Sequence, residues 1–119
     1  MIHDLKLYGE NFDRMESGNK TREYRLYDEK RRLINVGDTI RFISSSNNDK
    51  CLYADVEKIE IFTNWYDCYE KYFDDDFKER YESVQAVVDD TYNGYYTKED
   101  SERYGCCCIT ISRVRKTDN

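Results

Sequence analysis

The stretch that decides the fold is Ser17-Gly-Asn-Lys-Thr-Arg-Glu-Tyr-Arg-Leu-Tyr-Asp-Glu-Lys-Arg-Arg32, continued by Leu33-Ile-Asn-Val-Gly-Asp-Thr-Ile-Arg-Phe42. It opens with a turn, because Gly18 can adopt the positive φ that other residues avoid. The residues after the turn predict a strand over 21–26, and the glycine turn at 37–38 leads into a second strand over 39–44. In the first strand Thr21, Glu23 and Arg25 share one face, opposite Arg22, Tyr24 and Leu26.

Lys20 stands at the start of this strand, and its position decides what the charged residues can do. If Lys20 belonged to the strand, it would point away from Glu23, so we expect it to lie in the turn after Gly18. Glu23 can then hold the lysine or accept a proton, and Arg25 offers a planar fork for phosphate or carboxylate. The alternative is a set of exposed strand charges that form ordinary surface ion pairs.

A short basic segment, Lys30-Arg31-Arg32, follows the strand and lies close in sequence to Tyr24 and Tyr27. Basic and aromatic side chains together can follow a phosphate backbone and stack on bases. Asp28 is placed to cap a single helical turn here. A solvated turn with no ligand is the competing interpretation.

Local patterns predict the other elements. Asn64 is expected to cap the helix that follows it, because Trp65, Cys68, Tyr69 and Tyr72 have helical spacing. In the strand over 50–62, Leu52, Ala54 and Val56 alternate, but Ile59 and Ile61 break the parity, so we expect a β-bulge near 57–58. The remaining expected elements are a strand over 3–8, a short helix over 12–17 capped by Asn11, one or two helices over 77–89, a turn at 93–94, a helix from Thr97 to Gly105 and a strand over 106–114.

Composition limits the class of protein. The 119 residues fit one domain, 1–119, with one core, and tyrosine must help to fill it because 12 tyrosines accompany an apolar fraction of only 39%. The net charge of −6 argues against a protein that coats nucleic acid, yet it allows a local basic site. Residues 20–32 are basic on balance and residues 67–102 are acidic. This asymmetry favours a small anionic ligand or a short strand of nucleic acid over a long duplex.

The cysteines and acidic residues give no metal pattern. Strand geometry sends Cys106 and Cys108 to one face and Cys107 to the other, so we interpret them as small reduced core residues. The carboxylates at 74–76 and 89–90 match no calcium-binding spacing and are expected to lie at an exposed helix junction. We therefore expect no metal and no cofactor. The absence of a signal peptide and of a membrane-spanning segment favours a cytoplasmic protein.

Two motifs in this order resemble the ASCH domain family of the PUA-like superfamily. They are Gly18-x-Lys20-Thr21-x-Glu23-x-Arg25 and Leu33-Ile-x-x-Gly37-Asp38-x-Ile40-x-Phe42, with a late Tyr104-Gly105 before the last strand. The resemblance implies an α+β fold, a PUA-like small mixed β-barrel with flanking short helices. It also implies a cleft lined by the lysine, glutamate and arginine, with a role in RNA or modified-nucleoside handling.

Some members of this family are N4-acetylcytidine amidohydrolases, and the chain is similar to them at Lys20 but departs from them nearby. These enzymes have a threonine three residues after the lysine, where Glu23 stands here, and a downstream acid that in this chain is Glu70 or one of the aspartates at 74–76. If the chain is an enzyme, Lys20 and Glu23 are the expected catalytic residues.

Three functions remain open on the sequence. The first is recognition of a phosphorylated nucleoside or short single-stranded RNA. The alternatives are a small hydrolase, an amidohydrolase or nuclease acting on a modified nucleoside or RNA, and a domain that binds a protein partner. The sequence does not indicate an oligomeric state. The ligand-binding residues expected for the first function are Arg25, Thr21, Tyr24, Tyr27, Lys30, Arg31 and Arg32.

Overall fold

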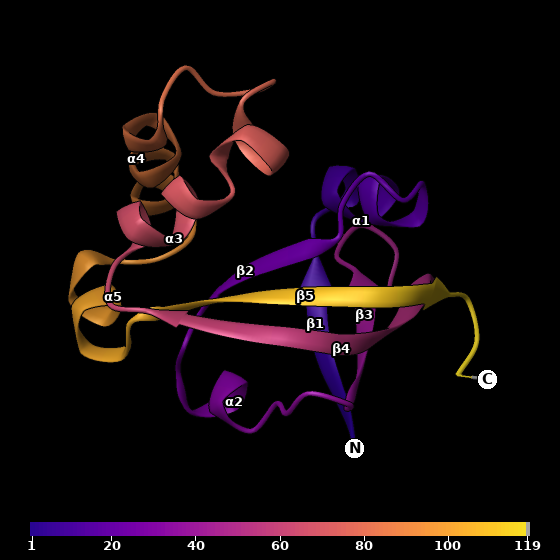
Figure 1. Ribbon diagram of the computed structural model, residues 1–119. Helices are drawn as coiled ribbons and strands as arrows, with labels where there is room; N and C mark the ends of the chain where they lie inside the picture. Colours follow the sequence, from indigo (N-terminus) through magenta and orange to yellow (C-terminus); the bar gives the residue numbers. More distant parts are fainter. Residues whose placement is uncertain (119) are drawn as a thin grey trace. The chain divides into compact units, whose positions relative to one another are not determined.

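The computed structural model describes residues 1–118 and contains five strands with short helices between them (Figure 1). The strands form one sheet with the order β1-β3-β4-β5-β2. The elements are β1 (Ile2–Leu7), α1 (Gly9–Glu16), β2 (Arg22–Leu26), α2 (Glu29–Arg32), β3 (Thr39–Ser44), β4 (Cys51–Phe62), α3 (Trp65–Lys71), η1 (Phe73–Phe77), α4 (Val84–Gly94), α5 (Lys98–Tyr104) and β5 (Cys106–Arg115).

The chain divides into two compact units. The first comprises residues 1–23, 34–59 and 109–119, and the second comprises residues 24–33 and 60–108. Three strands, β2, β4 and β5, therefore contribute residues to both units.

The first unit is built on a mixed arrangement of strands. β1 runs parallel to β3, with Leu5 opposite Phe42, and β3 runs antiparallel to β4, with Phe42 opposite Leu52. Helix α1 packs beside β3 (Figure 1), since Phe12 and Met15, three residues apart, form its buried stripe. The other fully buried apolar residues of this unit include Leu7, Ile34, Ile40, Ala54, Val56, Ile109 and Ile111.

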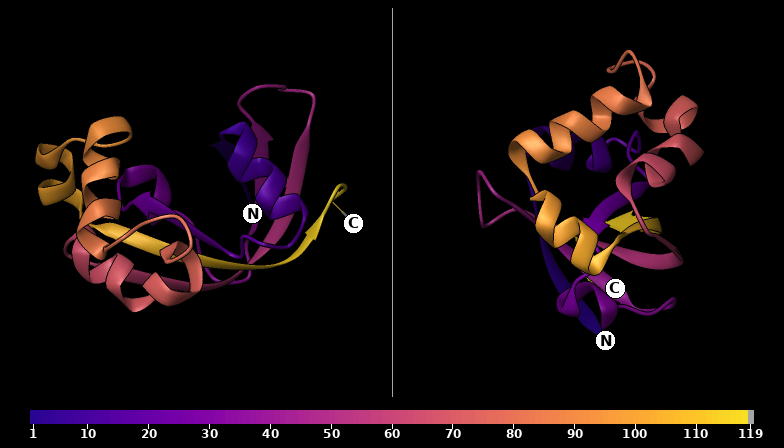
Figure 2. Two further views of the ribbon diagram at one scale, coloured as in Figure 1. Left: turned by 90° about the horizontal axis from the view of Figure 1, so that it is seen from above. Right: turned by 90° about the vertical axis from the view of Figure 1, so that its left-hand side faces the viewer.

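The second unit is built around an aromatic core. Helices α3 and α4 lie side by side (Figure 2), and α3 contributes Trp65, Cys68 and Tyr69 to the interior. Trp65 stacks between Tyr69 and Tyr96 at centroid distances of 5.5 and 5.4 Å. Its indole N–H donates to Ser101 Oγ at 2.8 Å, so the buried polar group has a partner. Leu26, Phe77, Val87, Val88, Cys106 and Cys108 complete this core.

Local capping signals give the helix boundaries in several places. The side chains of Asn64, Thr97 and Asp28 accept hydrogen bonds from the backbone of the third residue after each, which confirms all three predicted N-caps. Gly105 ends α5 with φ +69°, and a Cβ there would lie 2.8 Å from the Phe62 carbonyl oxygen. Only glycine therefore fits this approach of the α5–β5 turn to β4.

The expected inward position of Ile61 in β4 is wrong. Ile61 is 58% exposed, although it was expected to face inward. Glu60 faces the interior instead, because its carboxylate accepts from the Lys71 ammonium and the Tyr72 hydroxyl. Phe62, two residues on, packs against the aromatic core. Glu57 and Lys58 are both exposed, and the β-bulge expected near them stays a prediction.

Two helix boundaries also differ from expectation. Helix α1 begins at Gly9, and Asn11 lies inside it, so Asn11 is not its cap. In the region expected to be helical over 77–89, η1 ends at Phe77, residues 78–83 are not helical, and α4 begins only at Val84 and runs through the predicted turn at 93–94.

Candidate functional site

Lys20 lies in the turn before β2 and contacts Glu23. Gly18 has φ +87°, and the amides of Asn19 and Lys20 both donate to the Arg14 carbonyl, at 2.9 and 3.2 Å. This turn lets the Lys20 ammonium reach Glu23 Oε2 at 3.5 Å and donate to the Arg22 carbonyl oxygen at 2.8 Å. The two side chains are only 12% and 7% exposed. The pair is therefore a largely desolvated lysine–carboxylate contact, unlike a surface ion pair.

Strand β2 continues from this pair into the second unit, where Arg25 lies half-buried. The Ile111 amide donates to the Thr21 carbonyl and the Tyr27 amide to the Gly105 carbonyl, both at 3.0 Å. These two bonds define an antiparallel register between β2 and β5, in which Arg25 is directly opposite Cys107. The Thr21 side chain is exposed.

Tyr24 belongs to the aromatic core of the second unit. Its ring lies 4.9 Å from Phe77 and 5.5 Å from Tyr69, and its hydroxyl donates to the Asp76 carboxylate. Burial raises the pKa of Tyr24, and the nearby Cys108 and Asp76 raise it further, so the hydroxyl keeps its proton and remains a donor. Asp76 thus provides the hydrogen-bond acceptor for the Tyr24 hydroxyl.

The basic segment forms the short helix α2, whose side chains have different partners. Asp28 caps the helix through the Arg31 amide at 3.1 Å, and its other oxygen accepts from Arg31 Nη1 at 2.8 Å. The Arg32 guanidinium lies 4.3 Å from the centre of the Tyr27 ring and also donates to the Tyr104 carbonyl at 3.2 Å. Lys30 is exposed. Tyr27 and Arg32 therefore form a preassembled cation–aromatic stack.

The cysteines separate by face as predicted. Cys106 and Cys108 belong to the aromatic core, with Cys68, whereas Cys107 does not. Burial raises the pKa of Cys107 to about 12, while the positive charges of Arg31 and Arg25 act in the opposite direction. In the β2–β5 register Arg25 shares the face of Cys107. All five cysteines are free thiols.

No metal-binding arrangement is found in residues 1–118, where no group of three or more His, Cys, Asp or Glu side chains converges to hold an ion. Four acids were considered as the counterpart of the downstream acid of the amidohydrolases. Asp76 is half-buried and accepts from the Tyr24 hydroxyl, whereas Glu70, Asp74 and Asp75 are exposed. The same described part of the chain contains no helix long and apolar enough to cross a bilayer.

The structure thus brings the expected residues together in two sets. Lys20 contacts Glu23 in the first unit. In the second, Arg32 lies on the Tyr27 ring, and Arg31 pairs with Asp28 instead of with either of them. The joint cleft of lysine, glutamate and arginine stays a prediction. Sequence reasoning missed the Tyr24–Asp76 and Glu60–Tyr72 contacts, because nothing in the local pattern marks a hydrogen bond between residues 52 positions apart.

Comparisons with known proteins agree on family and fold. The family model of the ASCH domain matches residues 5–115. The hypothetical protein PH0355, known from a crystal structure, shares 28% sequence identity with this chain. The two structures match with a TM-score of 0.79 over 94% of this chain and 98% of that one. The solution structure of protein PF0455 from Pyrococcus furiosus is 27% identical, with a TM-score of 0.72 and coverage of 94% and 96%.

A mutant of ZmASCH from Zymomonas mobilis shares the fold at 17% identity, with a TM-score of 0.66, and the match covers 94% of this chain and 68% of that one. No curated protein matches the sequence. The expected α+β, PUA-like fold is confirmed by these structures and by the mixed sheet with its short helices.

Proposed function

The chain belongs to the ASCH domain family, and from this premise we propose that it binds short single-stranded RNA or a phosphorylated nucleoside through the basic segment 27–32 and Arg25. ASCH domains are generally RNA-binding. The family match runs through both compact units, which supports the interpretation of residues 1–119 as one domain.

The observation that carries the proposal is the stack of Arg32 on Tyr27 at 4.3 Å. A guanidinium on an aromatic ring presents a flat surface and a positive charge together, which suits a base and its phosphate. Lys30 adds a second exposed cation on the same helical turn. Because the chain as a whole is acidic, this local basic segment favours a short ligand.

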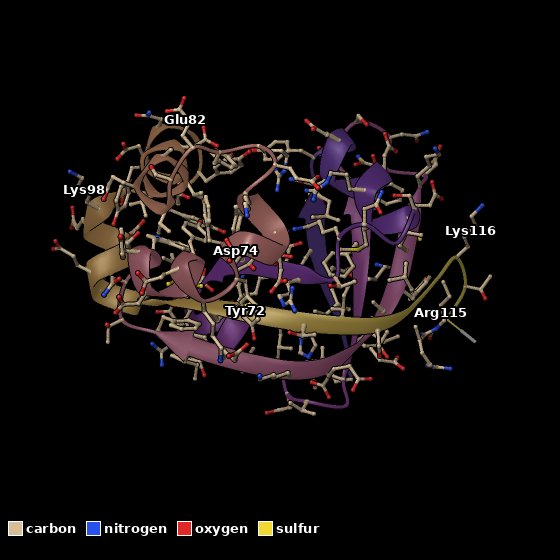
Figure 3. The ribbon with its side chains drawn as sticks, turned by 45° about the horizontal axis from the view of Figure 1, so that its top comes forward. Tyr72, Asp74, Glu82, Lys98, Arg115 and Lys116 are labelled. Atoms are coloured by element: carbon tan, nitrogen blue, oxygen red, sulfur yellow. The ribbon has the colours of Figure 1, made fainter. Side chains whose placement is uncertain are left out.

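Fluorescence anisotropy with a labelled single-stranded RNA oligonucleotide tests the proposal. We expect the affinity to fall as salt rises, with a log–log slope of roughly −0.7 per phosphate contacted. The double variant Lys30→Ala/Arg32→Ala should reduce both the affinity and this slope. Lys98→Ala is the matched control, because Lys98 projects outward from α5 (Figure 3). Equal loss in the control and the double variant would contradict a specific role for α2.

A second candidate function, hydrolysis of an acylated nucleoside, rests on the Lys20–Glu23 contact. A lysine held at 3.5 Å from a buried carboxylate, with little water around it, is arranged to exchange a proton with a bound substrate. Incubation with N4-acetylcytidine, followed by chromatography of the nucleosides, tests this function. Release of cytidine that is lost in Lys20→Ala would support it, and no release by the wild-type protein would exclude it for this substrate.

A further inference from the structure

A second cation–aromatic stack, which the proposed function does not use, lies beside the stack of Arg32 on Tyr27. The Arg103 guanidinium is 5.1 Å from the centre of the Tyr104 ring, at the end of α5. Arg103 is exposed and Tyr104 is half-buried, and the same holds for Arg32 and Tyr27. The second unit therefore carries two positions of the same kind, each with an exposed guanidinium on an aromatic ring.

Direct hydrogen bonds join the two stacks. The Arg32 guanidinium donates to the Tyr104 carbonyl at 3.2 Å. The Tyr27 amide donates to the Gly105 carbonyl at 3.0 Å, and the Tyr104 hydroxyl donates to Glu29 Oε1 at 3.2 Å. Glu29 and Arg32 are three residues apart on α2, so one face of this helical turn meets Tyr104. The two stacks are therefore immediate neighbours within one compact unit.

The turn at Tyr104-Gly105 fixes this arrangement. Gly105 has φ +69°, and a Cβ there would lie 2.8 Å from the Phe62 carbonyl oxygen. The two carbonyls that accept from Tyr27 and Arg32 therefore belong to a turn whose conformation and packing both require glycine. Because the two stacks are held in place before a ligand arrives, less entropy is lost when a ligand binds.

The charges of both stacked arginines are available to a ligand. Arg32 contacts a neutral ring and a neutral carbonyl, and Arg103 contacts a neutral ring. Neither is paired with a carboxylate within residues 1–118. A long strand of RNA would bring several phosphates close to the other charges of α5, which favours a short ligand. These charges are the exposed carboxylates of Glu99, Asp100 and Glu102.

We propose that Arg103 on Tyr104 is a second base-binding position, so that α2 and the end of α5 take two consecutive nucleotides of single-stranded RNA. This inference rests on the proposed function and extends its site by one nucleotide. One base stacks on Arg32 and the next on Arg103, since the plane of a guanidinium is a stacking surface for an unpaired base. The phosphate that links the two nucleosides meets positive charge from both arginines.

A titration with four adenine nucleotides tests the second position. They are AMP, ADP, and the 5′-phosphorylated di- and triadenylates, and NMR chemical shifts of the full chain measure each affinity. We expect the dinucleotide to bind about tenfold or more tightly than AMP, which is the gain from one more stacked base. The trinucleotide should gain much less again, because its third base lies beyond both stacks. ADP adds charge but no base, so it should not reproduce the gain.

Variants identify the residues responsible. Arg103→Ala and Arg32→Ala should each reduce the affinity for the dinucleotide to that for AMP. Tyr104→Leu should do the same, although the bond from Arg32 survives because it is made to a main-chain carbonyl. Arg80→Ala is the matched control and should keep the full gain. Arg80 is also exposed, lies 5.6 Å from the centre of the Tyr81 ring and donates to a backbone carbonyl.

The outcomes separate this inference from the proposed function. A dinucleotide that binds no more tightly than AMP, or an equal gain for ADP, would overturn the second position. RNA recognition through α2 would still stand if Lys30→Ala/Arg32→Ala weakens binding of the longer oligonucleotide. A gain that is lost in Arg103→Ala but kept in Arg32→Ala would confine binding to α5 and overturn both proposals. If neither the four nucleotides nor the oligonucleotide binds, both proposals fail.

Discussion

Two groups of cations in this protein differ in their surroundings. Lys20 is largely buried and its ammonium is used internally, by the Glu23 carboxylate and the Arg22 carbonyl. On α2, Arg32 rests on a neutral ring and Arg31 retains a donor without a partner among the described residues. The first arrangement neutralises its charge. On α2 Arg31 is likewise ion-paired with Asp28 at 2.8 Å, whereas the exposed Arg32 and Lys30 keep charge available for an incoming anion. We therefore expect substitutions in the first to change stability and substitutions in the second to change binding.

The largest expected effect is on stability, from Glu23→Ala. This change leaves the Lys20 ammonium buried without its counter-ion, which should lower the free energy of unfolding by about 3 kcal/mol. Glu16→Ala is the matched control, because Glu16 meets Lys116 at 4.0 Å on the surface, and should cost less than about 1 kcal/mol. Urea denaturation monitored by circular dichroism measures both. Similar losses in the two variants would remove the distinction between the buried and exposed pairs.

The next largest effect is on binding, from Lys30→Ala/Arg32→Ala. Loss of two cations from α2 should weaken RNA binding by about ten- to a hundredfold, since each charged hydrogen bond contributes about 1.5–3 kcal/mol. The unfolding free energy should change by less than about 1 kcal/mol, because the side chains of Lys30 and Arg32 are both exposed. On the same preparation, isothermal titration calorimetry measures the RNA affinity and urea denaturation measures the unfolding free energy. A variant that is clearly less stable but binds RNA normally would show that these cations of α2 act in stability and not in binding.

A smaller effect is expected at Tyr27, the neutral half of the stack. Tyr27→Ala should weaken RNA binding about tenfold by removing one stacking surface, whereas Tyr27→Phe should bind nearly as well as wild type. Anisotropy with the same oligonucleotide compares the three proteins. If the phenylalanine variant were as weak as the alanine variant, the hydroxyl, and not the ring face, would be the binding group.

The smallest effect concerns a surface carboxylate in the first unit. Hydrogen bonds from Arg113 and from Arg115, which lies at the end of β5 (Figure 3), hold the pKa of Asp55 below its ordinary value. A lowered folded pKa stabilises the protein above the unfolded pKa, and this contribution disappears as pH falls through the folded value. Asp55→Asn should therefore flatten the fall in stability below about pH 4. Thermal unfolding across that range checks the change, and an unaltered slope would contradict it.

These features differ in how far the sequence reveals them. The turn position of Lys20 follows from strand parity and Gly18, and the caps at Asp28, Asn64 and Thr97 follow from residues three apart, because these interactions are local. The inward position of Glu60 does not follow from the sequence, since a carboxylate in an apolar strand pattern is normally exposed. Its partners Lys71 and Tyr72 come from a different element, so only the folded structure explains why Ile61 faces outward.

The candidate site, too, combines features that the sequence predicts with features that only the structure shows. Arg31 was expected to contact ligand because of its charge, but the sequence does not reveal that Asp28 occupies one edge of the guanidinium and leaves Nε buried. Tyr24 was expected to stack on a base, and that role stays a prediction. Its ring packs on Phe77 and its hydroxyl binds Asp76, and both contacts depend on the π-helical turn at 73–77.

The most direct test of the central claim is an NMR titration of the full chain with a short single-stranded RNA. The account predicts that the largest backbone shifts fall on Arg25, Cys107 and residues 27–32, and that they saturate with the ligand. Shifts confined to the acidic helices α3 to α5, or spread evenly over the chain without saturation, would contradict it.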